Sequence, residues 1–204
     1  MRLTSILSAA SLSLALTLSA YAVRVGDQAP AFTAVDSQGK THSLAEYRGK
    51  YVVLEWTNHG CPYTKKHYES GNMQALQKEW TAKGVVWLTI LSSAQGNEGY
   101  LSPADENAYI SKMHADPTAA LIDPKGTIGH LYDAKTTPDM YVIDPQGKLI
   151  YSGAIDDHAT TDASDIQGSK NYVSAALAES LAGQPVATGY TRPYGCSVKY
   201  AGAE

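Results

Sequence analysis

The sequence has only two cysteines, Cys61 and Cys196, among its 204 residues. They do not form a Cys-x-x-Cys pair, so a local dithiol is excluded as the redox centre. A soft-metal site built from Cys61, His59 and His67 would have suitable ligand types, but no further ligand supports it. A polar turn that caps a helix explains the same residues, and we expect no bound metal.

Clusters of basic residues are also absent. The chain carries 16 Lys and Arg against 20 Asp and Glu, a formal net charge of −4 at pH 7. A mildly acidic chain without basic clusters argues against nucleic acid or anionic lipid as a partner. No internal repeat and no low-complexity linker divides the sequence. We therefore predict one domain over residues 23–204.

No apolar run is long enough for a typical membrane span. Residues 6–18 form a short apolar stretch diluted by serine and threonine, whereas a spanning helix needs about twenty residues. Arg2 before this stretch and Ala20-Tyr21-Ala22 after it are typical of a secretory signal peptide. No cysteine lies near the predicted cleavage site, so we do not expect a lipoprotein anchor. We predict that residues 1–22 are removed and that the mature protein is periplasmic or secreted, where disulfides are permitted.

The stretch around Cys61 predicts a reactive cysteine. Residues 51–56 have the β-branched and aromatic composition of a buried strand, and residues 57–60 form a polar turn. Pro62 is suited to the first turn of a helix. Cys61 is therefore expected at a helix N-terminus, where unpaired N–H groups and the helix dipole stabilise a thiolate. A buried structural cysteine is the alternative.

Strands alternate with helices along the rest of the chain. This order predicts an α/β fold with a mixed central sheet flanked by helices and an N-terminal hairpin over residues 26–50. The C-terminal tail, residues 184–204, is rich in proline and glycine, and we expect it to be irregular. The further strands are expected at residues 31–35, 41–44, 85–91, 119–122, 140–143 and 149–153, and the helices at 62–70, 72–80 (capped by Asn72 after a break at Gly71), 102–114, 126–132 and 171–181.

Several motifs carry a resemblance to a known family. Cys61-Pro62-Tyr63-Thr64-Lys65 resembles the Cys-x-x-Cys-Lys site of the thioredoxin superfamily, with Thr64 replacing the second cysteine. Residues 58–63, 137–139, 153–157 and 195–200 resemble the peroxiredoxin-like redoxins of the alkyl hydroperoxide reductase/thiol-specific antioxidant branch. The resemblance extends from about residue 26 to residue 200. It implies a thioredoxin-like fold and an antioxidant thiol oxidoreductase that needs no cofactor, because sulfur carries the electrons.

The resemblance also implies roles for residues near Cys61. It implies a cis peptide bond at Thr137-Pro138 beside the nucleophile, with the Thr137 backbone available to a bound peptide by strand addition. Glu55 stands where thioredoxins keep a buried acid that moves protons, although a surface carboxylate at a strand end is the alternative. Thr64 can hydrogen-bond a thiolate from one turn into the helix.

Cys196 has two possible roles. The motif from Gly195 to Tyr200 matches the family's Gly-Cys-x-x-Lys-Trp tail with tyrosine in place of tryptophan, which implies a resolving cysteine. Cys61 would attack a hydroperoxide or a protein thiol/disulfide, and Cys196 would then form an intramolecular disulfide that an external thiol reductant reopens. The alternative is a non-catalytic binding module with a structural disulfide between Cys61 and Cys196, which holds an extended peptide near Pro138.

The sequence departs from true peroxiredoxins in two places. Asn58 stands three residues before Cys61 where those enzymes have threonine, and Leu54 stands seven before it where they have proline. The hydroxyl group that activates peroxide in those enzymes is therefore not carried over to this chain.

Overall fold

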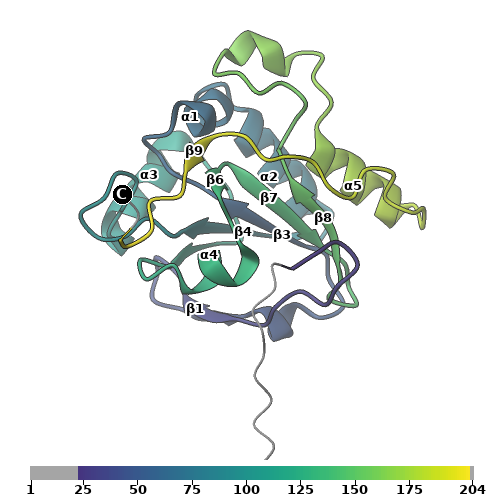
Figure 1. The fold of residues 1–204 in the computed structure, drawn as a ribbon, viewed down its shortest axis with the longest axis horizontal. Coiled ribbons are helices and arrows are strands. Elements are labelled where there is room, and N and C mark those ends of the chain that lie inside the picture. Colours follow the sequence, from purple (N-terminus) through teal and green to yellow (C-terminus); the bar gives the residue numbers. More distant parts are fainter. Residues whose placement is uncertain (1–22, 203–204) are drawn as a thin grey trace, which may run out of the picture.

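A five-stranded mixed sheet forms the centre of the protein in a computed structural model that describes residues 23–202 (Figure 1). The predicted signal peptide, residues 1–22, lies outside the described residues. The sheet has the order β5-β4-β3-β7-β8, in which β3, β4 and β5 are parallel and β7 and β8 are antiparallel to their neighbours. The bounds are β3 Val52–Trp56, β4 Val86–Leu91, β5 Ala119–Ile122, β7 Asp139–Ile143 and β8 Leu149–Gly153.

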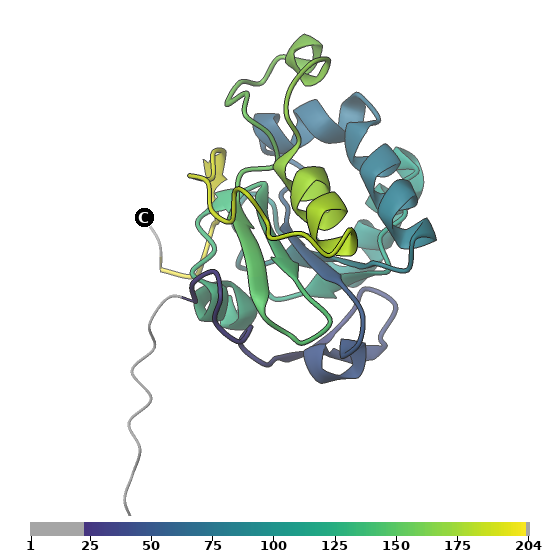
Figure 2. The same cartoon turned by 90° about the vertical axis from the view of Figure 1, so that its right-hand side faces the viewer.

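Helices cover both faces of this sheet (Figures 1 and 2). Because side chains alternate along a strand, β3 directs Val53 into a core shared with α1, α2 and α5, and directs Leu54 toward α4 and the N-terminal hairpin. This arrangement confirms the predicted thioredoxin-like α/β fold with its hairpin extension. The remaining elements are β1 Thr33–Val35, β2 Thr41–Ser43, η1 Leu44–Tyr47, α1 Pro62–Glu69, α2 Asn72–Ala82, α3 Pro103–Met113, α4 Thr127–Tyr132, β6 Thr136–Thr137, η2 Ala163–Ile166, α5 Tyr172–Leu181 and β9 Cys196–Ser197.

The predicted cap of α2 is wrong in detail. The helix break falls at Gly71 as expected, but Gly71 itself is the cap residue, with φ of 79° in the left-handed region that glycine adopts readily. Asn72 is the first helical residue. Its side-chain Nδ2 lies 2.9 Å from Nδ1 of His67, so it joins the two helices instead of capping the second.

The C-terminal tail is more ordered than the sequence indicated. It runs from the end of α5 across the sheet to α4, and within it β9 pairs antiparallel with β6 (Figure 1). Earlier in the tail, Ser152 of β8 donates its backbone N–H to the carbonyl of Gly189 at 3.0 Å. Prolines and glycines around a two-residue strand leave no periodic pattern, and for this reason the sequence predicts an irregular tail.

Across residues 23–202, no helix is both long and apolar enough to cross a membrane.

Glu55 is a carboxyl group inside the core. It lies on β3 with no solvent-exposed surface, so the surface alternative is wrong. Its Oε1 accepts a hydrogen bond from the Tyr68 hydroxyl at 2.8 Å, and its Oε2 accepts from Nε1 of Trp87 at 2.8 Å and from Nε2 of Gln77 at 3.3 Å. Burial raises the pKa of Glu55 to about 7 although these hydrogen bonds lower it.

This raised pKa predicts a pH-dependent stability. Between the ordinary pKa of 4.5 and about 7, the folded state keeps a proton that the unfolded state has lost, so unfolding becomes easier as pH rises through this window. The full loss is about 3 kcal/mol. Glu55→Gln should remove the part of the slope that Glu55 contributes, because its amide oxygen can still accept from Trp87 and its NH₂ can donate to the Tyr68 hydroxyl. The part contributed by Asp139 and Glu106, whose pKa values burial also raises to about 7, should remain.

Urea unfolding between pH 5 and 8 measures this effect. Glu79→Gln is the matched control, because Glu79 is a half-exposed carboxylate paired with Lys83 at the surface. The control should keep the slope of the parent protein. An unchanged slope in Glu55→Gln would show that Glu55 is ionised in the folded state throughout this range.

Candidate active site

Cys61 lies at the end of the turn that connects β3 to α1. It is the cap residue of α1, with an extended backbone at φ of −69° and ψ of 124°, and Pro62 occupies the first helical position. The helix start therefore falls where the sequence predicted it. The side chain has no solvent-exposed surface. Its Sγ lies 3.0 Å from the carbonyl oxygen of Thr137 and 2.7 Å from Sγ of Cys196.

The pairing of β6 with β9 brings Cys196 to this position. Thr137 lies opposite Cys196 in the register, and the Thr137-Pro138 peptide bond is cis, as the resemblance implied. Gly195 has a φ of 143°, and a Cβ atom there would lie 2.2 Å from the carbonyl oxygen of Thr137. Only glycine fits such a close approach of two backbones. The two sulfur atoms are thus adjacent, and both cysteines are free thiols in this structure.

The two thiols have opposite pKa shifts. Burial raises the pKa of Cys61, but the hydrogen bond from Cys196, the backbone N–H of Thr64 and the Thr137 side chain outweigh it and hold this pKa below its ordinary value. Burial and the neighbouring Cys61 sulfur raise the pKa of Cys196 to about 12. The pair therefore loses its first proton from Cys61, and the Cys196 thiol remains as a hydrogen-bond donor to the thiolate.

The other predicted supporting residues contribute in different ways. Thr64 acts through its backbone amide, whereas its Oγ1 is buried and has no hydrogen-bond partner among the described residues. The hydrogen bonds of Glu55 go to Tyr68, Trp87 and Gln77, so none of those found within residues 23–202 joins it to Cys61.

Asp139 is an acid that sequence reasoning missed. It follows Pro138 and is buried, and its Oδ2 accepts the backbone N–H of Lys135 at 3.0 Å. Burial raises the pKa of Asp139 to about 7.

The two histidines considered as metal ligands face different neighbours. The ring of His59 lies 5.9 Å from that of Tyr109, and His67 contacts Asn72. Within the described residues, no group of three His, Cys, Asp or Glu side chains could hold a metal ion.

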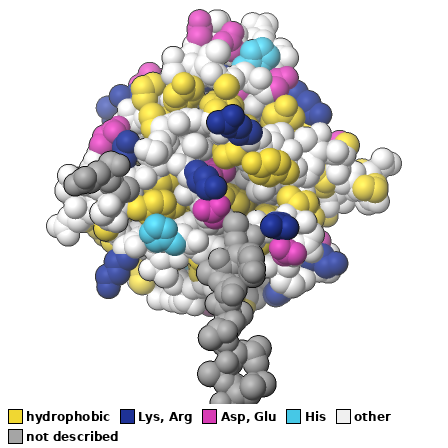
Figure 3. Space-filling model, viewed as in Figure 1, with side chains coloured by type: hydrophobic (Ala, Val, Ile, Leu, Met, Phe, Trp, Pro, Cys, Tyr) yellow, Lys and Arg dark blue, Asp and Glu magenta, His cyan; other side chains and the backbone are white. Residues whose placement is uncertain are grey.

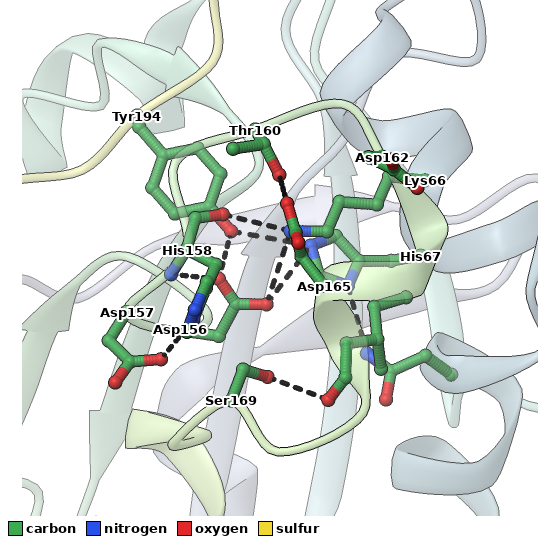
Figure 4. Close-up of polar contacts among 12 residues, drawn as sticks. Lys66, His67, Asp156, Asp157, His158, Thr160, Asp162, Asp165, Ser169 and Tyr194 are labelled. Atoms are coloured by element: carbon green, nitrogen blue, oxygen red, sulfur yellow. Dashed lines mark hydrogen bonds and ion pairs between the residues drawn. The ribbon is translucent and has the colours of Figure 1, made fainter.

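A second group of residues links α1 to the tail, and of these the sequence singled out only His67, as a possible metal ligand (Figure 4). Lys66 and His67 lie on α1, Asp156 follows β8, and Tyr194 lies two residues before Cys196. The Tyr194 hydroxyl donates to Oδ1 of Asp156, and Nζ of Lys66 lies 3.6 Å from the other carboxylate oxygen. The only available signal was that Asp156 belongs to one of the motifs shared with the redoxins.

Two hollows flank the tail. They have volumes of about 460 and 610 Å³, and Pro193 lines both. Tyr190 and Lys135 line the first, and Asp156 and Tyr194 line the second. On this face, hydrophobic side chains are spread among single acidic and basic groups, and no patch of one charge dominates (Figure 3).

Comparison with known proteins gives the same fold. A curated relative, the thioredoxin-like protein YneN of Bacillus subtilis, is 28% identical over 127 residues, which cover 62% of this chain and 69% of YneN. An uncharacterized conserved protein from Geobacillus kaustophilus superposes with a TM-score of 0.73 at 26% identity, covering 89% of this chain and 94% of that one. A putative thiol:disulfide interchange protein DsbE from Chlorobium tepidum superposes with a TM-score of 0.57 at 24% identity, covering 76% and 99%.

The family assignment rests on a direct match. The profile of the AhpC/TSA family matches residues 25–152, which is more than half of the chain and includes β3, Cys61, Pro138 and β8 as far as Ser152. The match ends before the tail that carries Cys196. This chain therefore belongs to the AhpC/TSA family and is a peroxiredoxin-like redoxin of the thioredoxin superfamily.

Proposed function

We propose that this protein is an exported thiol-dependent oxidoreductase of the antioxidant class, in which Cys61 is the nucleophile and Cys196 the resolving cysteine. One observation carries the proposal: the two sulfur atoms lie 2.7 Å apart, with the pKa lowered at Cys61 and raised at Cys196. Of two adjacent thiols, the one that ionises first supplies the attacking thiolate. The protonated Cys196 thiol is already next to Cys61 for the second step.

The oxidative half-reaction has two steps. The Cys61 thiolate attacks the O–O bond of a hydroperoxide, takes one oxygen as a sulfenic acid and, with one added proton, releases the other as an alcohol or water. Cys196 then attacks this sulfur, forming the disulfide and releasing water. A disulfide substrate follows the same order, with substrate thiols as the leaving groups. The position of Cys196 requires little movement before the second attack.

The cycle needs a reductant from outside the chain. A dithiol donor would attack the disulfide, become a disulfide itself and leave Cys61 and Cys196 reduced. No other cysteine of this chain can serve as an internal donor. The N-terminal signal pattern supports export, and in an oxidising compartment the cycle depends on such a donor.

The alternative of a peptide-binding module has less support. It requires a free strand edge beside Pro138, whereas β6 is already paired with β9 of the same chain. Its disulfide would be purely structural, and such a role gives no purpose to the opposite pKa shifts of Cys61 and Cys196.

The hydrogen bond from Cys196 predicts how substitutions of Cys196 change the pKa of Cys61. In Cys196→Ser, a hydroxyl can still donate to the thiolate, whereas Cys196→Ala removes the donor. The midpoint of Cys61 alkylation against pH should therefore be lower in the serine variant than in the alanine variant. In the parent protein it should lie below about 8.5, the ordinary cysteine value. Equal midpoints in the two variants, or a parent midpoint at or above that value, would contradict the proposed coupling.

The assigned roles predict different losses for the two cysteine variants. Cys61→Ser should show no thiol-dependent consumption of hydroperoxide, because no covalent step remains. Cys196→Ser should consume about one equivalent and stop as a sulfenic acid, because the first attack does not need Cys196. Stopped-flow measurement of hydroperoxide, followed by mass spectrometry of the protein, distinguishes the two results.

Thermal and urea unfolding of the oxidised proteins provides the contrasting outcome. A structural disulfide would stabilise the parent by about 3–5 kcal/mol, and both variants would lose this amount equally. Equal losses of stability without turnover in the parent would support the binding module and would refute the proposed enzyme.

A further inference from the structure

The tail of this protein occupies the strand edge beside Cys61. An extended peptide binds a sheet by adding a strand to an exposed edge through main-chain hydrogen bonds. The edge next to Cys61 is β6, and β9 already takes it, with Cys196 opposite Thr137 and Ser197 opposite Thr136. The backbone N–H of Val198 extends this pairing to the carbonyl of Lys135 at 3.0 Å. Cys196 thus lies where a cysteine of a bound peptide would have to lie to reach Cys61.

Contacts after Cys196 hold this segment in place. The Tyr200 hydroxyl donates to the carbonyl of Ala134 at 2.7 Å, and its ring stacks on His130 with centroids 4.1 Å apart. The backbone N–H of Ala94 donates to the carbonyl of Lys199 at 2.8 Å. Val198 is buried in the core beneath α4. A chain end anchored on this side cannot leave β6 without breaking several contacts together.

Contacts before Cys196 form a buried latch, which we define as Lys66, Asp156 and Tyr194 (Figure 4). Asp156 and Lys66 are 2% and 3% exposed, and Nζ of Lys66 also donates to the carbonyl of His158 at 2.8 Å. A buried carboxylate is costly unless it is paired and hydrogen-bonded. Asp156 therefore favours the arrangement in which the Tyr194 hydroxyl reaches it, and this fixes the tail two residues before Cys196.

We propose that the latch keeps the tail in the peptide position and thereby restricts Cys61 to small oxidants such as hydroperoxides, excluding disulfides of folded proteins. This inference rests on the proposed function of Cys61. A hydroperoxide needs only a local shift of the Cys196 side chain to reach Cys61, which is covered in the structure. A protein disulfide needs space for a second chain along β6, so the whole segment from Tyr194 to Val198 must first leave.

The test compares two oxidants on the reduced mature protein. Hydrogen peroxide is the small oxidant and insulin is the protein disulfide. With insulin, the Cys61 thiolate would attack one sulfur, one insulin thiol would leave, and Cys196 would displace the second, so that one insulin disulfide becomes two thiols as the protein disulfide forms. Loss of the protein thiols, followed by rapid acid quench and mass spectrometry, measures both reactions.

Tyr194→Phe should open the site to the larger oxidant. It removes the hydroxyl that donates to Asp156 and keeps the ring, which packs 5.7 Å from the ring of Tyr63. We expect the rate with insulin to rise about tenfold or more, the effect expected on losing a hydrogen bond to a charged group. The rate with hydrogen peroxide should change by less than about threefold, since no catalytic group is removed. Tyr190→Phe is the matched control, because Tyr190 lies in the same tail with an exposed side chain, and it should match the parent with both oxidants.

The outcomes separate this inference from the proposed function. A parent protein that reacts with insulin as fast as Tyr194→Phe does, while still reacting with hydrogen peroxide, overturns the inference alone. A Cys61 that reacts with neither oxidant in any variant overturns the proposed function.

Hydrogen exchange of the Val198 amide tests the inference without relying on the variant's folding. In the reduced parent it should exchange about a hundredfold or more slowly than in an unstructured peptide, because it is paired with Lys135. Exchange at the rate of an unstructured peptide would show that the tail does not hold the edge, and would overturn the inference.

Discussion

The pairing of β6 with β9 determines the chemistry of the site. It places Thr137 opposite Cys196, and the carbonyl of Thr137 and the Cys196 sulfur both contact Cys61. The close approach of the two backbones depends on Gly195, where any side chain would meet the carbonyl of Thr137. Without this pairing, Cys61 would still cap α1, but the thiol that donates to its thiolate would be absent, and with it the resolving group that we propose.

Three of the buried acids, Glu55, Asp139 and Asp156, are held in different ways. Glu55 has three neutral donors and no cation, so burial raises its pKa to about 7. Burial also raises the pKa of Asp139, beside Pro138, to about 7. Asp156 instead has Lys66 at 3.6 Å as well as the Tyr194 hydroxyl. The first two can therefore exchange protons near neutral pH. Asp156 connects α1 to the tail.

Local features of the site could be predicted from the sequence, and long-range ones could not. The strand, turn and proline around Cys61 encode a cysteine at a helix N-terminus within a few residues of chain, and the structure places it there. The position of Cys196 depended on a resemblance, because 135 residues separate the sulfurs and no periodicity connects them. The contact of Asp156 with Tyr194 spans 38 residues of loop and tail, where composition predicts only irregular chain. Glu55 showed the same limit, because its alternatives differed only in tertiary partners.

The tail gives the site an order of events that follows from its position. While Cys61 is reduced, the tail covers its sulfur, and the Cys196 thiol supplies the hydrogen bond that favours the thiolate. After Cys61 is oxidised, the same thiol is already within reach of the new electrophile. Access of the oxidant to Cys61 and attack of Cys196 on the oxidised Cys61 therefore make opposite demands on the tail. Contacts that hold Cys196 close speed the second attack and hinder the approach of the oxidant. An oxidant small enough to need only a side-chain shift escapes this conflict, and a bulky one does not. On the proposed mechanism, the segment that resolves the intermediate is therefore also the one that selects which oxidant can form it.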